Sequence, residues 1–158
     1  MAFSSLRALI AGGSGVPKAL FGYGTTGSRV SLTNKVDSSG NVATDTTGVG
    51  TARSNPAAAG YGTDTALFGY GSTGSNVSLT NKVDSSGNVA TDTTGVGTVR
   101  HGLAAAGYGT DKALFGYGDT GSNSNSSMTN KVDSSGNVAT DTTGVGTARN
   151  GLAAAGYG

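Results

Sequence analysis

The sequence predicts an all-β protein built from tandem copies of one four-stranded unit, and two observations carry this prediction. The segment DSSGNVATDTTGVGT occurs three times without a change, at residues 37–51, 84–98 and 133–147. The segment ALFGYG also recurs, every 47 residues from Ala19 onward. A period of roughly 40 to 50 residues with several short apolar runs is typical of propeller blades, whereas a β-solenoid rung is usually about 20 to 30 residues long.

Each copy is expected to open with a hairpin. In the middle copy, Thr-Asp-Thr separates the Ala-rich run ending at Gly62 from the ALFGYG run beginning at Ala66, which favours two strands joined by a tight turn. The small residues of the first strand suit a crowded position near the axis of a propeller. The aromatic residue of the second strand is expected to pack between blades, with Phe21, Phe68 and Phe115 buried to the same extent.

Two further strands are expected in each copy. Residues 77–83 alternate apolar and polar side chains, as a half-buried strand does. Residues 84–88 are rich in Asp, Ser, Gly and Asn, which favours a turn, and the β-branched run 89–94 favours a fourth strand. A connector of the form Gly-Val-Gly-Thr-Xaa-Arg leads to the next copy. No stretch shows the apolar period of a helix.

The repeats divide the chain into four parts. Residues 1–17 hold a degenerate first strand, and three repeats follow at 18–64, 65–111 and 112–158, each of which runs from the second strand of one blade to the first strand of the next. Since a closed propeller needs four to eight blades, we expect a ring completed by oligomerisation, either a six-bladed dimer or a head-to-tail assembly. A fragment of a longer array is the remaining alternative.

The last copy ends in an orphan first strand, Gly151 to Gly158. We expect this strand to pair with the second strand of the first copy, around Lys18 to Gly24, either within a ring or from a neighbouring chain. The physical reason is that an unpaired apolar edge strand promotes uncontrolled association. The degenerate strand at Ala8 to Gly13 is the alternative partner for that edge.

Charge and composition argue against several classes of partner. Lys and Arg number 10 and Asp 9, for a net charge of +1 with no basic run, so nucleic acid is not an expected partner. The chain has no Cys, which excludes disulfides and thiolate chemistry. The apolar stretch near the N-terminus is too short and too interrupted for a membrane span, and its internal Arg does not fit a signal peptide.

The repeat resembles the kelch repeat over nearly the whole chain. Arg100 to Ala106 is similar to the Arg and small-residue strand that open a kelch blade, and Leu114 to Gly118 is similar to its Gly-terminated strand. Val83-Asp84, a polar turn and Val89 stand where a kelch blade has Tyr-Asp, a turn and Trp. The resemblance implies a propeller fold. A looser likeness to Gly-rich tandem-repeat structural proteins of bacteriophages and environmental viruses implies a virion or other extracellular setting.

Differences among the copies fall mainly in the loop after the second strand and in the connector before the first strand. In a blade both lie on one rim, so this rim is a candidate recognition surface, because binding residues are usually carried on loops. Free drift of surface loops is the alternative explanation. The candidate recognition residues are Arg29, Arg53, Asn76, Arg100, His101, Asp119, Asn123, Arg149 and Asn150.

The sequence offers no catalytic or metal-binding constellation. His101 is the only His and the chain has neither Cys nor Glu, so no triad, zinc site or other cofactor is expected. The loop beginning at Asp37 lacks the closing carboxylate of a calcium loop and is interpreted as a turn. The Asp residues of the fourth strand, Asp45, Asp92 and Asp141, are expected to pair with the Arg of the connector.

These features favour a non-enzymatic structural or assembly protein that associates with itself, in a virion or extracellular assembly. The alternative is a lectin-like or protein-binding propeller module that reads a glycan or protein with the variable rim. The two hypotheses differ in the partner, which is a second copy of the chain in the first and a foreign ligand in the second.

Overall fold

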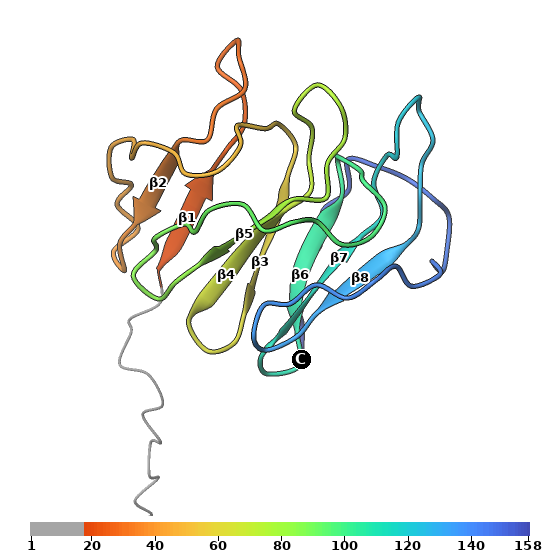
Figure 1. The fold of residues 1–158 in the computed structure, drawn as a ribbon. Coiled ribbons are helices and arrows are strands. Elements are labelled where there is room, and N and C mark those ends of the chain that lie inside the picture. The colour runs from red at the N-terminus through yellow and green to blue at the C-terminus, as the bar shows by residue number, and fades with distance from the viewer. Residues whose placement is uncertain (1–17) are drawn as a thin grey trace, which may run out of the picture.

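The computed structural model describes residues 18–158, and all regular secondary structure in this part of the chain is β. Three small antiparallel sheets stand side by side, one for each copy of the repeat (Figure 1). The all-β prediction is therefore confirmed, while the degenerate strand expected at Ala8 to Gly13 lies outside the described residues. None of the described residues belongs to a helix that is long and apolar enough to cross a membrane.

Eight strands of four or five residues form these sheets, in the order β1-β2, β3-β4-β5 and β6-β7-β8. The strands are β1 (Ala19–Gly22), β2 (Thr33–Val36), β3 (Ala57–Tyr61), β4 (Thr65–Gly69), β5 (Thr80–Val83), β6 (Ala104–Tyr108), β7 (Lys112–Gly116) and β8 (Thr129–Val132).

The predicted hairpin at the start of each copy is present in the second and third sheets. In the second sheet, Ala57 of β3 lies opposite Gly69 of β4, and Tyr61 lies opposite Thr65 at the turn. The Thr65 hydroxyl donates a hydrogen bond of 2.5 Å to the Tyr61 carbonyl, which closes the turn. On the other edge of β4, Gly69 lies opposite Thr80 of β5, which places the predicted third strand beside the second.

The prediction of a regular fourth strand at 89–94 is wrong. The segment meets β5 only at two isolated bridges, between Val83 and Val89 and between Thr80 and Thr93. Three residue steps on β5 thus oppose four on the partner, which is a bulge of one residue. Within the bulge, the side-chain amide of Asn81 donates to the Ala90 carbonyl at 3.0 Å and takes the place of a backbone ladder bond.

Adjacent sheets pack through an aromatic ring placed on a glycine. A Cβ added to Gly69 would lie 2.7 Å from the ring of Phe115, so only glycine leaves room for that ring. Gly22 and Phe68 repeat the contact one copy earlier, at 3.0 Å. Phe115 also meets the ring of Tyr70 edge-on, with centroids 5.2 Å apart and planes at 65°. These two glycines therefore allow adjacent sheets to pack closely through the aromatic ring.

The apolar core is divided among the interfaces between sheets. Leu67, Tyr70, Phe115 and Val132 belong to one buried cluster between the second and third sheets. A smaller cluster that includes Phe68 lies between the first and second sheets. A single copy therefore has no core of its own, and stability must come from stacking, as in other repeat proteins.

The prediction that Phe21, Phe68 and Phe115 are equally buried is wrong for the first of them. Phe68 and Phe115 are 6% and 0% exposed, whereas Phe21 is 61% exposed. Each ring packs on the copy before its own, and the described residues place no sheet before β1. Sequence identity among the copies therefore does not give them identical environments.

The orphan strand, residues 151–158, does not pair with β1 of its own chain. The Gly151 amide donates to the Gly102 carbonyl at 2.8 Å, and a Cβ on Gly156 would lie 2.9 Å from the Gly107 carbonyl oxygen, which places the segment along β6. The C-terminus accordingly lies beside the third sheet in Figure 1. The expectation that this strand pairs with β1 of the same chain is therefore wrong. Pairing with β1 of a neighbouring chain stays a prediction.

Candidate functional site: the junctions between copies

A buried arginine joins each pair of neighbouring copies. Arg100, whose side chain is fully buried, places its guanidinium 4.5 Å from the centroid of the Tyr70 ring. Tyr70 has a left-handed backbone conformation, with φ of 63°, that residues other than glycine seldom adopt. The Tyr70 hydroxyl donates to the Val96 carbonyl at 3.1 Å and holds the ring in place. The cation and the ring therefore form a preorganised cation–π pair.

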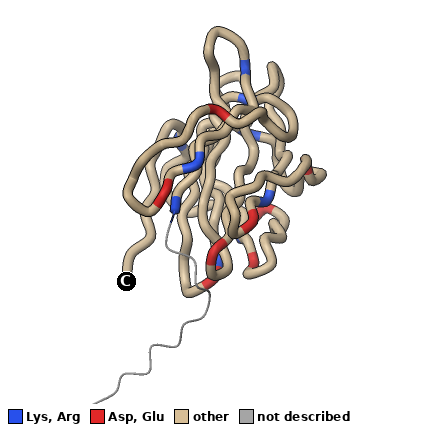
Figure 2. The backbone as a smooth tube through the Cα atoms, turned by 90° about the vertical axis from the view of Figure 1, so that its left-hand side faces the viewer, with Lys and Arg blue, Asp and Glu red and all other residues tan. Residues whose placement is uncertain are grey.

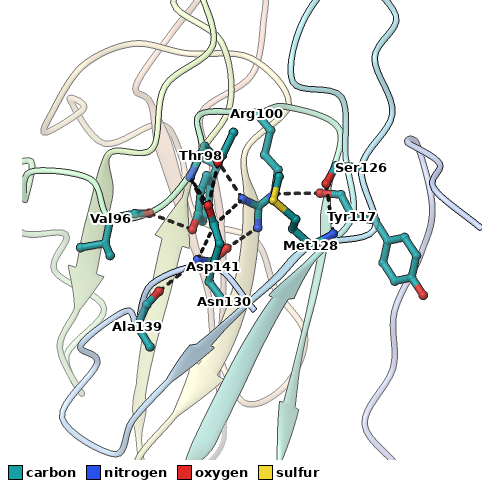
Figure 3. Close-up of polar contacts among 10 residues, drawn as sticks. Val96, Thr98, Arg100, Tyr117, Ser126, Met128, Asn130, Ala139 and Asp141 are labelled. Carbon is teal, nitrogen blue, oxygen red and sulfur yellow. Dashed lines mark hydrogen bonds and ion pairs between the residues drawn. The ribbon is translucent and has the colours of Figure 1, made fainter. Parts of the chain in front are cut away.

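The same guanidinium is held by hydrogen bonds from both sides of the junction (Figure 3). Arg100 donates through Nη1 to the Thr98 carbonyl at 3.0 Å and through Nε to the Tyr117 carbonyl at 2.8 Å. Its Nη2 donates to Asn130 Oδ1 of the following copy. Asp141 lies 3.6 Å from Nη1 and completes the charge balance. Because these are directional contacts to a charged group, they fix the stacking geometry as well as stabilise it.

The carboxylate of Asp141 is itself anchored by the connector of the preceding copy. It accepts hydrogen bonds from the Thr98 amide at 2.9 Å and the Thr98 hydroxyl at 2.6 Å, and one from Asn130 at 2.9 Å. Burial acts to raise the pKa of Asp141, but these hydrogen bonds and the charge of Arg100 outweigh it and hold the pKa below its ordinary value.

The junction between the first and second copies repeats this arrangement. Arg53 lies 4.0 Å over the ring of Tyr23, donates to Asn81 Oδ1 at 2.6 Å and stands 3.8 Å from Asp92. The Thr51 hydroxyl donates to Asp92 at 2.6 Å. The same five residue types thus form both junctions, with one difference: Arg100 Nε donates to the Tyr117 carbonyl, whereas the buried Arg53 Nε has no hydrogen-bond partner.

Two sequence expectations about these residues need correction. Arg53 and Arg100 were candidates for a recognition rim, but both are 0% exposed because the junctions enclose them. The expected Asp–Arg pairs exist, but across copies: the Arg of one connector meets the Asp of the following copy, as Arg53 meets Asp92. Asp45 instead accepts a hydrogen bond from Asn34 at 2.8 Å.

Half of a junction is presented at each end of the described stack. At the third copy, Arg149 lies 4.4 Å over the ring of Tyr117 and donates to the Thr147 carbonyl at 3.0 Å, but its side chain is exposed. At the first copy, Asn34 and Asp45 form the acceptor pair without a described Arg. We call the surface around Tyr117 and Arg149 the C-terminal face and the surface around Phe21, Asn34 and Asp45 the N-terminal face.

Several remaining rim candidates meet in one polar cluster. His101 Nδ1 lies 2.9 Å from Asn76 Oδ1, and Asn76 donates to the Asp119 carbonyl at 3.0 Å. Asn150 donates to the Asp119 carboxylate at 3.4 Å. The cluster borders a groove of about 400 Å³ that runs along the connectors. Four of the nine predicted residues are thus brought together from the second and third copies.

The other two rim candidates stand apart from this cluster. Arg29 is exposed in the loop after β1, at a bridge with Thr25. Asn123 is exposed at the tip of the longer loop of the third copy, with φ of 59°.

Within residues 18–158 no group of three or more His, Cys, Asp or Glu side chains is arranged to hold a metal ion.

We expect the stability of the stack to fall on acidification. Hydrogen bonds from the backbone and side chain of Asn137 lower the pKa of Asp133 in the turn after β8, and the pKa values of Asp92 and Asp141 in the junctions are also lowered from 3.8. A carboxylate whose pKa is depressed by folding contributes stability above its unfolded pKa and loses it as pH falls through the folded value. Melting temperature should therefore be steady between about pH 7 and 5 and decline below about pH 4.

Circular dichroism melts across this pH range would measure the effect. Asp141→Asn is the matched variant: it should be less stable at neutral pH and should show a shallower acid decline, because one of the contributing carboxylates is gone. An equally steep decline in the variant would assign the pH dependence to other groups.

Lys and Arg positions are interspersed with Asp positions along the molecule and do not gather on one face (Figure 2). Contacts between copies therefore depend on specific pairs such as Arg100 with Asn130 rather than on opposed charge fields.

Comparison with known proteins adds no family to this picture, since the sequence matches neither a protein-family model nor a curated protein.

Proposed function

We propose that this chain is a non-enzymatic structural protein that assembles with copies of itself by continuing its own stack of repeats. In this proposal each copy acts as a kelch-like blade, and association extends the stack into a closed ring or an open array. The likeness of the repeat to Gly-rich structural proteins of viruses supports a virion or another extracellular assembly as its setting.

The observation that carries the proposal is the complementarity of the two end faces. The C-terminal face presents the Tyr117–Arg149 half of a junction, and the N-terminal face presents the Asn34–Asp45 half. Inside the chain the same two halves meet twice, with the Arg buried each time. A contact that joins unlike faces is heterologous, and it generates rings or filaments.

The distribution of exposed apolar side chains supports the same conclusion. Phe21 and Val42 are 61% and 57% exposed on the N-terminal face, and Val145 and Tyr157 are 84% and 102% exposed beside the C-terminal face. The residue equivalent to Val42 in the third copy, Val138, packs on the buried core. The four most exposed large apolar side chains among residues 18–158 thus fall at the two faces, as is typical of interaction surfaces, while Val49, Val99 and Tyr108 are exposed to a smaller extent.

The proposal predicts a concentration-dependent native mass. Sedimentation velocity or light scattering of the 158-residue chain should show species at whole multiples of 15.3 kDa that grow with concentration. A ring should stop at one defined multiple, whereas an open array should keep growing. A mass that stays at one chain up to millimolar concentration would overturn the proposal.

A second candidate function rests on the polar cluster of Asn76, His101 and Asp119 beside the connector groove. Convergent polar side chains next to a groove suit a glycan or peptide, which is the lectin-like alternative. Binding of labelled protein to a glycan array would support it if Asn76→Ala removes the signal. Loss of the signal only in variants of the end faces would assign the binding to assembly instead.

A further inference from the structure

A cavity of about 500 Å³ lies between the first and second sheets. Its walls are the start of β1, the outer side of β3 at Ala58 to Gly60, and the turns at 63–66 and 84–87. Among the described residues, the edge of β1 that faces away from β2 carries no strand, whereas β4 and β7 are both paired on that edge. The cavity therefore stands where a first strand of the first copy belongs.

The matching place between the second and third sheets is filled by Tyr61 at the end of β3. Tyr61 is 7% exposed, and its ring lies where a Cβ on Gly136 would be, at 2.4 Å. The next residue, Gly62, donates its amide to the Asp111 carbonyl at 2.8 Å and would bring a Cβ within 3.4 Å of the Ser134 carbonyl. A tyrosine followed by glycine is thus the group that occupies this site.

The cavity carries the same recognition residues one copy earlier. The residues equivalent to Asp111, Ser134 and Gly136 in the repeat are Asp64, Ser85 and Gly87. All three line the cavity. The cavity is therefore the Tyr61 site of the preceding interface, without a described tyrosine in it.

We propose that the C-terminal strand of a second copy of this chain occupies the cavity and that its Tyr157 is the anchor. The inference rests on the proposed self-assembly and specifies its contact. Residues 152–158 repeat residues 103–109 without a change, and the Tyr157 side chain is fully exposed in its own chain. Because the segment already lies along β6, its outward edge and its tyrosine are presented to a neighbour.

The register of this contact follows from the second sheet. Ala57 pairs with Gly69 and Ala59 with Leu67 across β3 and β4. Transferred to the neighbour, Ala153 should lie opposite Gly22 and Ala155 opposite Leu20 of β1. Strand addition to an exposed sheet edge is a common mode of recognition in which backbone bonds supply affinity and side-chain pockets supply specificity.

The chain's own N-terminal sequence offers a poorer occupant. At the spacing of 47 residues that relates the first two copies, the residue equivalent to Tyr61 is Ser14, which has no ring to fill the cavity. The foreign strand supplies the tyrosine and the glycine after it, so complementarity favours the second copy.

The same placement brings together the two open junction halves. Arg149 would meet Asn34 and Asp45 as Arg53 meets Asn81 and Asp92. Phe21 would then pack on Gly116 and Tyr117, as Phe115 packs on Gly69 and Tyr70. Both contacts arise when the first copy of the neighbouring chain is placed against the third copy as the third copy is placed against the second.

The test compares Tyr157→Ser with Val99→Ser in the full chain by sedimentation velocity over a range of concentrations. Val99 is 42% exposed in the connector of the second copy and is not among the residues that define the two end faces, so it controls for the loss of an exposed apolar group. We expect self-association at least tenfold weaker for Tyr157→Ser and unchanged for Val99→Ser. If the unaltered chain associates and Tyr157→Ser associates equally well, the strand inference is wrong while the assembly proposal stands. If the unaltered chain never associates, both are wrong.

Disulfide trapping tests the register directly, because the chain has no Cys of its own. Two single-cysteine chains, Ala155→Cys and Leu20→Cys, should form a mixed disulfide when combined and oxidised, since directly opposed strand residues approach within disulfide range. The Ala155→Cys chain combined with Val99→Cys is the matched control and should form none. Equal yields in the two mixtures would overturn the proposed register.

Discussion

Phe115→Ala is expected to lower the free energy of unfolding by about 3 to 5 kcal/mol, the usual cost of removing a fully buried aromatic ring. The ring is 0% exposed, sits on Gly69 and meets Tyr70 edge-on, so its loss leaves a cavity at the interface of two sheets. The same substitution at Phe21, which is 61% exposed in the same hexapeptide, should cost about 0.5 kcal/mol or less.

Chemical denaturation followed by circular dichroism measures both variants, at concentrations where sedimentation shows single chains. Working with single chains matters because assembly would bury Phe21 and hide the difference. Phe21→Ala should instead weaken association when the concentration is raised. Equal losses of stability for Phe21→Ala and Phe115→Ala in single chains would show that the rings do not pack on the preceding copy.

The sequence was sufficient for the three strands of the second and third sheets and for β1 and β2 of the first sheet. Their signals are local: the alternation of 77–83 and the tight Thr-Asp-Thr turn after Gly62 each concern neighbouring residues, and both appear in the second sheet. What the repeat could not show is that Phe21 differs from Phe115, because the difference arises from position in the stack.

The fourth strand failed for a different reason. The β-branched run 89–94 has the propensity for a strand, but Asn81 inserts its amide toward Ala90 and a bulge replaces the ladder. Propensity describes single residues, and it was overridden here by a side chain from the neighbouring strand. The prediction therefore placed the segment correctly beside the third strand and was wrong in making it a regular strand.

The candidate site was predicted in part. Pairing between the fourth-strand Asp and the connector Arg was expected, but its crossing from one copy to the next was not, since identical copies make the two pairings indistinguishable in sequence. The roles of Asn130 and Thr98 were missed entirely. One signal could have found them: Asn and Thr are the same at these positions in all three copies, although the neighbouring loops vary. Polar residues that only form turns need not be kept in this way.

Arg100→Met is expected to lower the free energy of unfolding by about 3 kcal/mol, the lower end of the range for removing one partner of a buried ion pair. Arg100 is fully buried, whereas Asp141 is 26% exposed and keeps its hydrogen bonds from Thr98, so the carboxylate left behind remains partly solvated. Methionine retains most of the side-chain volume. The loss should therefore come from the hydrogen bonds, the ion pair and the contact with the Tyr70 ring.

Arg149→Met is the matched control in the same chain. Arg149 has an equivalent tyrosine beneath it and an equivalent bond to a Thr carbonyl, but its side chain is exposed, so its removal should cost single chains no more than about 1 kcal/mol. Denaturant unfolding of both variants under identical conditions gives the comparison. At high concentration, Arg149→Met should weaken self-association more than Arg100→Met does. The reason is that Arg149 belongs to an open half of a junction, whereas Arg100 lies in a closed junction. Equal stability losses in single chains would mean that enclosure by the next copy adds nothing, and the junction would then owe its stability to the aromatic stack alone.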